Sequence, residues 1–158
     1  MQPIDNTRLL INVLHELSAK QCYVGIPADS EKNSRDDAEI TNSEIGFKNE
    51  FGSPQENIPA RAHLLPGVSD ASDKIADILQ KAAARALSLR VDSSQALDNG
   101  LNAAGLVAVA SVKKKITDVL SPALAELTLS ERRRRGHDGE TPLIETGSYI
   151  GSINYIVE

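Results

Sequence analysis

Glu145-Thr146-Gly147 is the part of this sequence closest to a catalytic motif, because an acidic residue before Thr-Gly is also found in aspartic proteases. Those enzymes need two carboxylates that share a proton across a dimer or a duplicated fold. This chain has a glutamate where the proteases have an aspartate, and its surroundings are mostly helical in pattern. We therefore interpret Thr146 and Gly147 as a turn, with Glu145 as a capping or partner-contacting acid.

The three histidines, His15, His63 and His137, are too scattered for a metal site, since no two have the i,i+4 spacing of helical metal ligands. No serine lies in a Gly-x-Ser-x-Gly elbow and no glycine-rich phosphate loop is present. The single cysteine, Cys22, leaves no partner for an intramolecular disulfide and is expected to be a small buried strand residue. We expect no enzymatic activity, no cofactor and no metal.

Arg132 to Arg135 form the strongest charge feature. The run could contact a phosphate backbone or an acidic partner surface, or it could be a solvated, flexible loop. No aromatic residue is interleaved with it, so stacking on single strands is not indicated. The net charge of −5 argues against a general nucleic-acid binder.

A second motif, Asn49-Glu-Phe-Gly52, is followed by Ile58-Pro-Ala-Arg61. The pattern predicts a helix in which Phe51 belongs to the core and Gly52 is the left-handed C-cap. Prolines recur through residues 53–67, so we predict a stiff arm there, which would dock on a neighbour at little entropic cost. Arg61 could then hold a carboxylate through two hydrogen bonds.

The length and the apolar patterns along the chain indicate one α+β domain, 1–158. Apolar periodicity predicts two long helices, about 69–90 and 93–120, as an antiparallel or crossed pair. Shorter helices are expected near 5–19 and 37–51, and strands near 22–26 and 152–157 form a small sheet, unless the last strand pairs with a neighbouring chain. Connections are predicted to be a mobile loop at about 27–36, the proline-rich arm 53–67 and a polar basic loop 121–141.

The composition also bears on association and location. The 158 residues are 41% hydrophobic but only 3% aromatic, so the core has little large side-chain area and the protein is expected to gain stability by association. No apolar run is long enough to span a membrane, and the N-terminus lacks the pattern of a signal peptide. We therefore expect a cytoplasmic protein.

The motifs together resemble a family of tailed-bacteriophage neck, head–tail joining or tail-completion proteins. The matching pieces, in order, are Asn49 to Gly52, Ile58 to Arg61, Pro66, Leu120 to Pro122, Arg132 to Gly136, Pro142 to Gly147 and Ser152 to Tyr155. The chain departs from the family pattern at Ala62-His63, where Pro-Phe is expected, and at Glu145, where aspartate is expected.

The resemblance implies a structural virion protein, assembled in the host bacterial cytoplasm, that forms or joins a closed ring of six-fold or twelve-fold symmetry at the neck or tail top. Its partners would be portal, adaptor, tail-terminator or tail-tube proteins, with possible nonspecific contact to DNA in the channel and none to membrane. The alternative is a nucleic-acid-binding accessory protein that uses the arginine run. The candidate interface residues are Asn49, Glu50, Phe51, Gly52, Pro59, Arg61, His63, Arg132, Arg133, Arg134, Arg135, Glu145, Thr146 and Gly147.

Overall fold

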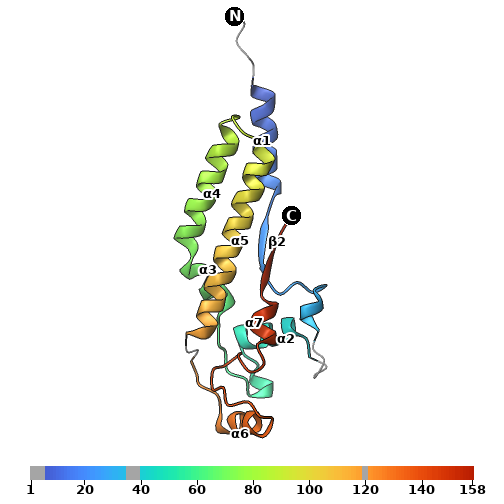
Figure 1. The fold of residues 1–158 in the computed structure, drawn as a ribbon, viewed down its shortest axis with the longest axis vertical. Coiled ribbons are helices and arrows are strands. Elements are labelled where there is room, and N and C mark those ends of the chain that lie inside the picture. The colour runs from blue at the N-terminus through green and yellow to red at the C-terminus, as the bar shows by residue number, and fades with distance from the viewer. Residues whose placement is uncertain (1–5, 35–39, 119–120) are drawn as a thin grey trace, which may run out of the picture.

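The computed structural model describes residues 6–34, 40–118 and 121–158, and it confirms the α+β class. Helices dominate, and a small antiparallel sheet lies against the longest of them (Figure 1). In chain order the elements are α1 (Thr7–Ala19), β1 (Cys22–Gly25), α2 (Asn42–Phe51), α3 (Leu64–Asp70), α4 (Ser72–Leu87), α5 (Ser93–Thr117), α6 (Glu126–Arg134), α7 (Ser148–Ser152) and β2 (Asn154–Val157), with short 3-10 turns at Glu31–Asn33 and Pro54–Glu56.

The antiparallel pair α4 and α5 forms the long axis of the molecule (Figure 1). Asp92 is the N-cap of α5, since its side chain accepts a hydrogen bond from the Gln95 amide at 2.8 Å. The two helices approach closely where Gly100 faces Ala82: a β-carbon built on Gly100 would lie 2.2 Å from that of Ala82. Small side chains at this crossing therefore set the distance between the helices.

Replacing Gly100 with alanine is expected to lower the free energy of unfolding by about 1–3 kcal/mol, because the added methyl group forces the helices apart. Gly151→Ala is the matched control, since nothing lies within 4 Å of a β-carbon at that position. Urea unfolding of both variants checks the difference. A Gly100→Ala protein as stable as the wild type would show that the helices can separate without cost.

The sheet brings together distant parts of the chain. β1 and β2 pair antiparallel, with Cys22 opposite Val157 and Gly25 opposite Asn154. The sheet packs on α5, where the Tyr155 ring lies over Gly105, and the Tyr155 hydroxyl donates to Asn102 Oδ1 at 3.0 Å. Of the two partners predicted for the last strand, the structure places it against the first strand.

Two apolar clusters form the core. One lies where α5 meets α7 and contains Val112, Ile116, Tyr149 and Ile153, all at most 3% exposed. The other lies where α1 meets the α4–α5 pair and is centred on Val13, Ala86 and Leu97. Since aromatic side chains are scarce, small and aliphatic residues do most of this packing.

Several predicted boundaries are wrong. The helical region predicted at 69–90 begins earlier, at Leu64, inside the predicted arm. It is divided at Ala71 into two helices, α3 and α4. Pro66 lies in the first turn of α3, where a missing amide hydrogen costs nothing. The predicted loop 121–141 contains α6. Part of the predicted 27–36 loop and the start of the predicted 37–51 helix lie outside the described residues.

The predicted burial of Phe51 is also wrong. Phe51, expected in the core, is 60% exposed, and Phe47 on the previous turn is 66% exposed. Their ring centroids lie 5.0 Å apart, so the only two phenylalanines of the chain form an exposed pair. On α1, Val13 is buried whereas the next residue, Leu14, is 56% exposed.

Candidate functional site

A groove of about 280 Å³ lies between α2, the last turn of α6 and the loop that leads into α7, with Leu124 from the segment before α6 also in its wall. Both sequence motifs contribute to it, one through Asn49 and the other through Glu145, Thr146 and Gly147. It is lined by Ile40, Ile45, Asn49, Leu124, Arg132, Leu143, Glu145, Thr146, Gly147 and Tyr149. The structure thus brings together residues that are about ninety positions apart, and Glu145 is the one carboxylate in this lining.

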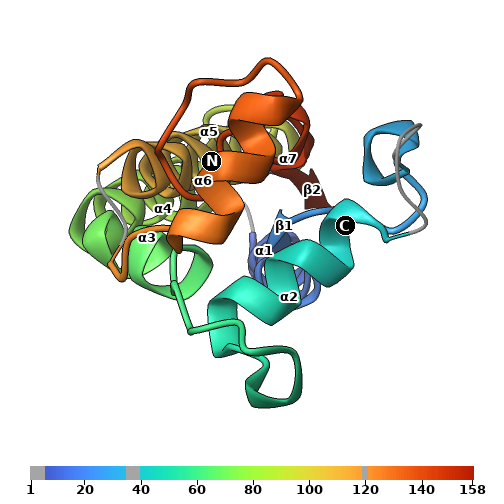
Figure 2. The same cartoon turned by 90° about the horizontal axis from the view of Figure 1, so that it is seen from below.

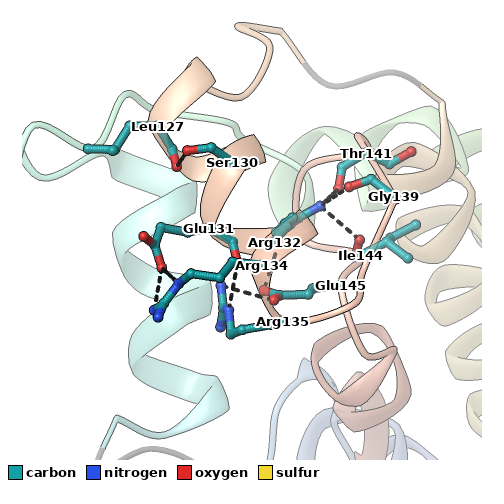
Figure 3. A network of polar contacts seen from close by, with 10 residues as sticks. All are labelled: Leu127, Ser130, Glu131, Arg132, Arg134, Arg135, Gly139, Thr141, Ile144 and Glu145. Atoms are coloured by element: carbon teal, nitrogen blue, oxygen red, sulfur yellow. Dashed lines mark hydrogen bonds and ion pairs between the residues drawn. The ribbon is translucent and has the colours of Figure 1, made fainter.

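Arg132 fixes the loop on one side of the groove (Figure 3). Its Nη1 donates to the carbonyl oxygens of Gly139, Thr141 and Ile144 at 2.8, 3.0 and 3.1 Å. Its side chain is 6% exposed. Burial lowers the pKa of Arg132, and the nearby Glu145 carboxylate opposes that shift. Arg132 therefore organises the loop from within the chain, which corrects its assignment as a residue that contacts a neighbouring subunit.

Glu145 lies between two guanidinium groups (Figure 3). One carboxylate oxygen is 3.7 Å from Arg132 Nε and the other is 3.0 Å from Arg135 Nη2. Both are ion pairs, but neither has hydrogen-bond geometry. Among the described residues, Arg132 Nε and Glu145 Oε1 are buried without a hydrogen-bond partner. Charge attraction, without a hydrogen bond, therefore holds the Glu145 carboxylate between the two arginines.

The rest of the arginine run is paired with carboxylates. Arg133 Nη1 lies 3.1 Å from Glu126 and its Nη2 lies 3.5 Å from Glu140, while Arg134 Nη2 lies 2.9 Å from Glu131. The run forms the last turn of α6 and the residue after it, where positive charge complements the helix dipole. The predicted flexible basic loop is wrong for these residues, because helix formation and ion pairs hold the guanidinium groups.

Glu50 and His63 form a second polar cluster, buried beside the groove. The Glu50 carboxylate accepts backbone hydrogen bonds from His63 at 2.8 Å, Leu64 at 2.9 Å and Leu65 at 2.9 Å. These amides lie at the start of α3, so one carboxylate satisfies three donors that a helix leaves open. Glu50 is 6% exposed and His63 is fully buried, so neither can contact a neighbour as predicted.

His63 links this cluster to the groove. Its Nδ1 lies 2.8 Å from the Arg61 carbonyl and its Nε2 contacts the Tyr149 hydroxyl. A neutral ring that donates from Nδ1 to the carbonyl and accepts from Tyr149 at Nε2 satisfies both contacts. Burial lowers the pKa of His63 and raises the pKa of Tyr149, which favours this uncharged pair.

Because the pKa of His63 is lowered in the folded protein, the unfolded chain binds a proton first as the pH falls below about 6.5. Stability is therefore expected to be full above that pH and to decrease below it, by at most about 1.4 kcal/mol per pH unit from this group. Urea unfolding between neutral and mildly acidic pH measures the effect. In His63→Gln this contribution should disappear, whereas in His15→Gln it should remain. An unchanged pH dependence in His63→Gln would contradict the assignment.

The contacts of Arg61 show that the predicted arm is wrong for this part of the chain. Its Nε donates to the Pro122 carbonyl at 2.7 Å and its Nη2 donates to the Ala123 carbonyl at 3.0 Å. The residue is 7% exposed, and burial lowers its pKa. The segment from Arg61 to Pro66 thus folds onto its own chain. The loop around Pro54–Glu56 still protrudes beside α2 (Figure 2).

The other predicted residues mostly shape the backbone. Gly147 has φ +82° and begins α7, and Thr146 Oγ1 accepts from the Ser148 amide at 3.3 Å, so the predicted turn is confirmed. Gly52 has the positive φ expected of a C-cap, but its ψ of 163° is extended, not left-handed. Pro59 is exposed.

Tyr149 was not predicted, although it joins both polar clusters. The one indication of this contact in the sequence is a glycine, Gly46, inside a predicted helix. In the structure a β-carbon at Gly46 would lie 2.9 Å from the Tyr149 hydroxyl.

Comparison with protein-family models, curated proteins and solved structures finds no match to this chain. Among the described helices, none combines the length and the apolar character needed to cross a membrane.

Proposed function

We propose that this protein is a structural subunit of a tailed-phage virion that forms or joins a closed ring at the head–tail junction or the upper end of the tail. Two kinds of evidence support the proposal. The first is the ordered set of motifs in the sequence. The second is the distribution of exposed apolar side chains, which favours a protein that functions by contact with other chains. The proposal does not depend on the arm, since Arg61 and His63 are buried.

The exposed pair Phe47 and Phe51 is the observation on which the proposal mainly depends. Phe51 belongs to the Asn-Glu-Phe-Gly motif, and both rings are more than half exposed. Burying them in the chain would stabilise the fold by roughly 25 cal/mol per Å². Large aromatic side chains that stay outside the core of an aromatic-poor protein favour a contact with another chain.

Helix α1, which lies at the opposite end of the molecule from α2 (Figure 1), also carries exposed apolar side chains. Leu9, Ile11 and Leu14 are 53, 55 and 56% exposed. A ring with head-to-tail contacts needs two unlike surfaces on each subunit, one for each neighbour. The exposed apolar residues of α1 and α2 could provide these two contacts, which supports the proposal.

The nucleic-acid alternative gains less support. Its main feature is the arginine run, and each guanidinium there lies near a glutamate carboxylate. Release of counterions from DNA requires cations that are available to replace them. The overall charge of −5 also disfavours binding to the negatively charged backbone of DNA.

The double substitution Phe47→Ser and Phe51→Ser is expected to prevent ring formation and to leave the fold intact, because both side chains are exposed. Negative-stain electron microscopy and sedimentation velocity of the purified protein, alone and mixed with phage tails, measure assembly. Leu106→Ser is the matched control, since Leu106 is 61% exposed in the middle of α5. Rings that form equally well in the double variant would rule out this surface as the contact, and a wild-type protein that forms no ring under any of these conditions would overturn the proposed function.

A further inference from the structure

A groove of about 440 Å³ runs between α4 and α5, and we call it the α4–α5 groove. Its lining comes only from residues 78–85 of α4, 91–92 of the turn and 95–103 of α5. Because the helices meet through small residues at Ala82 and Gly100, space remains between the larger side chains around that crossing. A hollow of this size is within the range of sites that accept a large side chain.

Positive charge lies along the α4 side of this groove. Lys81 and Arg85 both line it and both are exposed. Lys81 forms a surface ion pair with Asp77, whereas the Arg85 guanidinium has no ion pair or hydrogen bond with any residue that the structure describes. The one carboxylate of the lining, Asp92, already accepts a hydrogen bond as the N-cap of α5. An available guanidinium beside an apolar hollow favours an aromatic ring as the occupant.

Helix α2 offers a surface with the matching chemistry. Glu44, Phe47 and Phe51 have the i, i+3 and i+7 spacing of one helix face and all three are exposed; we call them the α2 stripe. The neighbouring cation, Lys48, is paired with Glu56 at 2.6 Å. The α2 stripe therefore offers two aromatic rings and a carboxylate, and the α4–α5 groove offers a hollow and two cations.

These two surfaces cannot meet within one chain. The turn between α4 and α5 lies at one end of the molecule, and α2 lies toward the other end (Figure 1). The α2 stripe must therefore come from a second copy. A contact between unlike surfaces leaves a free groove at one end and a free stripe at the other, so it continues from subunit to subunit and closes into a ring when the rotation allows.

We propose that the α4–α5 groove binds the α2 stripe of a second copy of this chain, with Lys81 and Arg85 facing the phenylalanine rings and the Glu44 carboxylate. The inference rests on the proposed function, since it names the surface that receives the phenylalanine pair of the ring. The groove suits the rings better than the aliphatic residues of α1 do, because it adds cations to an apolar hollow.

The first test reverses the charge of the groove. Arg85→Glu combined with Asn99→Glu removes one cation and places two carboxylates in the α4–α5 groove. Self-association, measured as a Kd by sedimentation velocity, should weaken by about thirtyfold or more. Both positions are exposed, so the circular dichroism spectrum should remain that of the wild type.

Gln80→Glu combined with Arg90→Glu is the matched control. This variant has the same change in net charge, at exposed positions that do not line the groove, and it should associate as the wild type does. Equal weakening in the two double variants, or no weakening in the groove variant, would overturn the proposal.

A mixing experiment tests which surfaces meet. The Phe47→Ser and Phe51→Ser double variant keeps the groove, whereas the Arg85→Glu and Asn99→Glu variant keeps the α2 stripe. Each should be monomeric alone. Their mixture should form a one-to-one dimer and no larger species, because only one working pair of surfaces remains. A mixture that stays monomeric at concentrations where the wild type associates would overturn the proposal.

The same measurements separate this inference from the proposed function. Wild-type rings together with equally good assembly of the groove variant would refute the groove assignment and leave the virion function intact. One-to-one pairing in the mixture, with a wild type that forms only open chains and does not bind phage tails, would refute the virion function and leave the groove assignment intact. A wild type that stays monomeric, both alone and with tails, would overturn both.

Discussion

Replacing Glu50 with alanine is expected to lower the free energy of unfolding by about 3–5 kcal/mol. The substitution removes the acceptor of three backbone hydrogen bonds, from His63, Leu64 and Leu65. All three amides at the start of α3 would then lose the carboxylate that accepts their hydrogen bonds. The site is buried, since Glu50 is only 6% exposed. The loss should also reach His63 and Tyr149, which pack in the same cluster.

Urea unfolding followed by circular dichroism measures this loss. Glu50→Gln keeps one amide oxygen as an acceptor and should cost less than alanine. Glu126→Ala is the matched control, because that carboxylate is 78% exposed, and its stability should equal that of the wild type. A Glu50→Ala protein that loses less than about 1 kcal/mol would show that other groups replace the three hydrogen bonds.

The second large effect is expected for Arg132→Ala, at about 3–4 kcal/mol. This change removes the donor that binds the carbonyl groups of Gly139, Thr141 and Ile144. It also removes one of the two guanidinium groups that stabilise the Glu145 carboxylate. The 139–147 loop should lose its order, so hydrogen exchange should increase at its amides more than in α5.

Arg134→Ala gives a control within the same run of arginines. The Arg134 side chain is 75% exposed and pairs with Glu131 on the surface, so its loss should cost less than about 0.5 kcal/mol. Arg132→Lys should not restore stability, because one ammonium group cannot reproduce the planar arrangement of guanidinium donors. Equal stability of the Arg132→Ala and Arg134→Ala proteins would contradict the assigned role of Arg132.

The parts of the fold that the sequence predicts well are those in which apolar residues recur regularly. Residues Leu97, Ala104 and Val112 recur with helical spacing, and all are buried in α5. Asp92 marks its start by a local capping contact that needs no knowledge of the rest of the chain. The turn at Gly147 is likewise a local feature of the backbone.

What could not be predicted depends on contacts that polar residues make once the chain has folded. Arg61, His63 and Arg132 are types usually found on the surface. A carbonyl group and a tyrosine far away in the sequence hold Arg61 and His63 inside, whereas the loop that follows α6 holds Arg132. The short helix α6 has no apolar stripe, so periodicity could not reveal it. The prediction for Phe51 is wrong in the opposite direction: an apolar residue was assigned to the core, but it is exposed.

The pairing of β1 with β2 has a consequence for the order of folding. Cys22 and Val157 pair although nearly the whole described chain separates them in the sequence. By contrast, a short turn joins α4 to α5. Closing the larger loop costs more chain entropy, so the helical hairpin should form early and the sheet late. Gly105 and neighbouring residues on α5 then provide the surface on which Tyr155 and its strand close the structure.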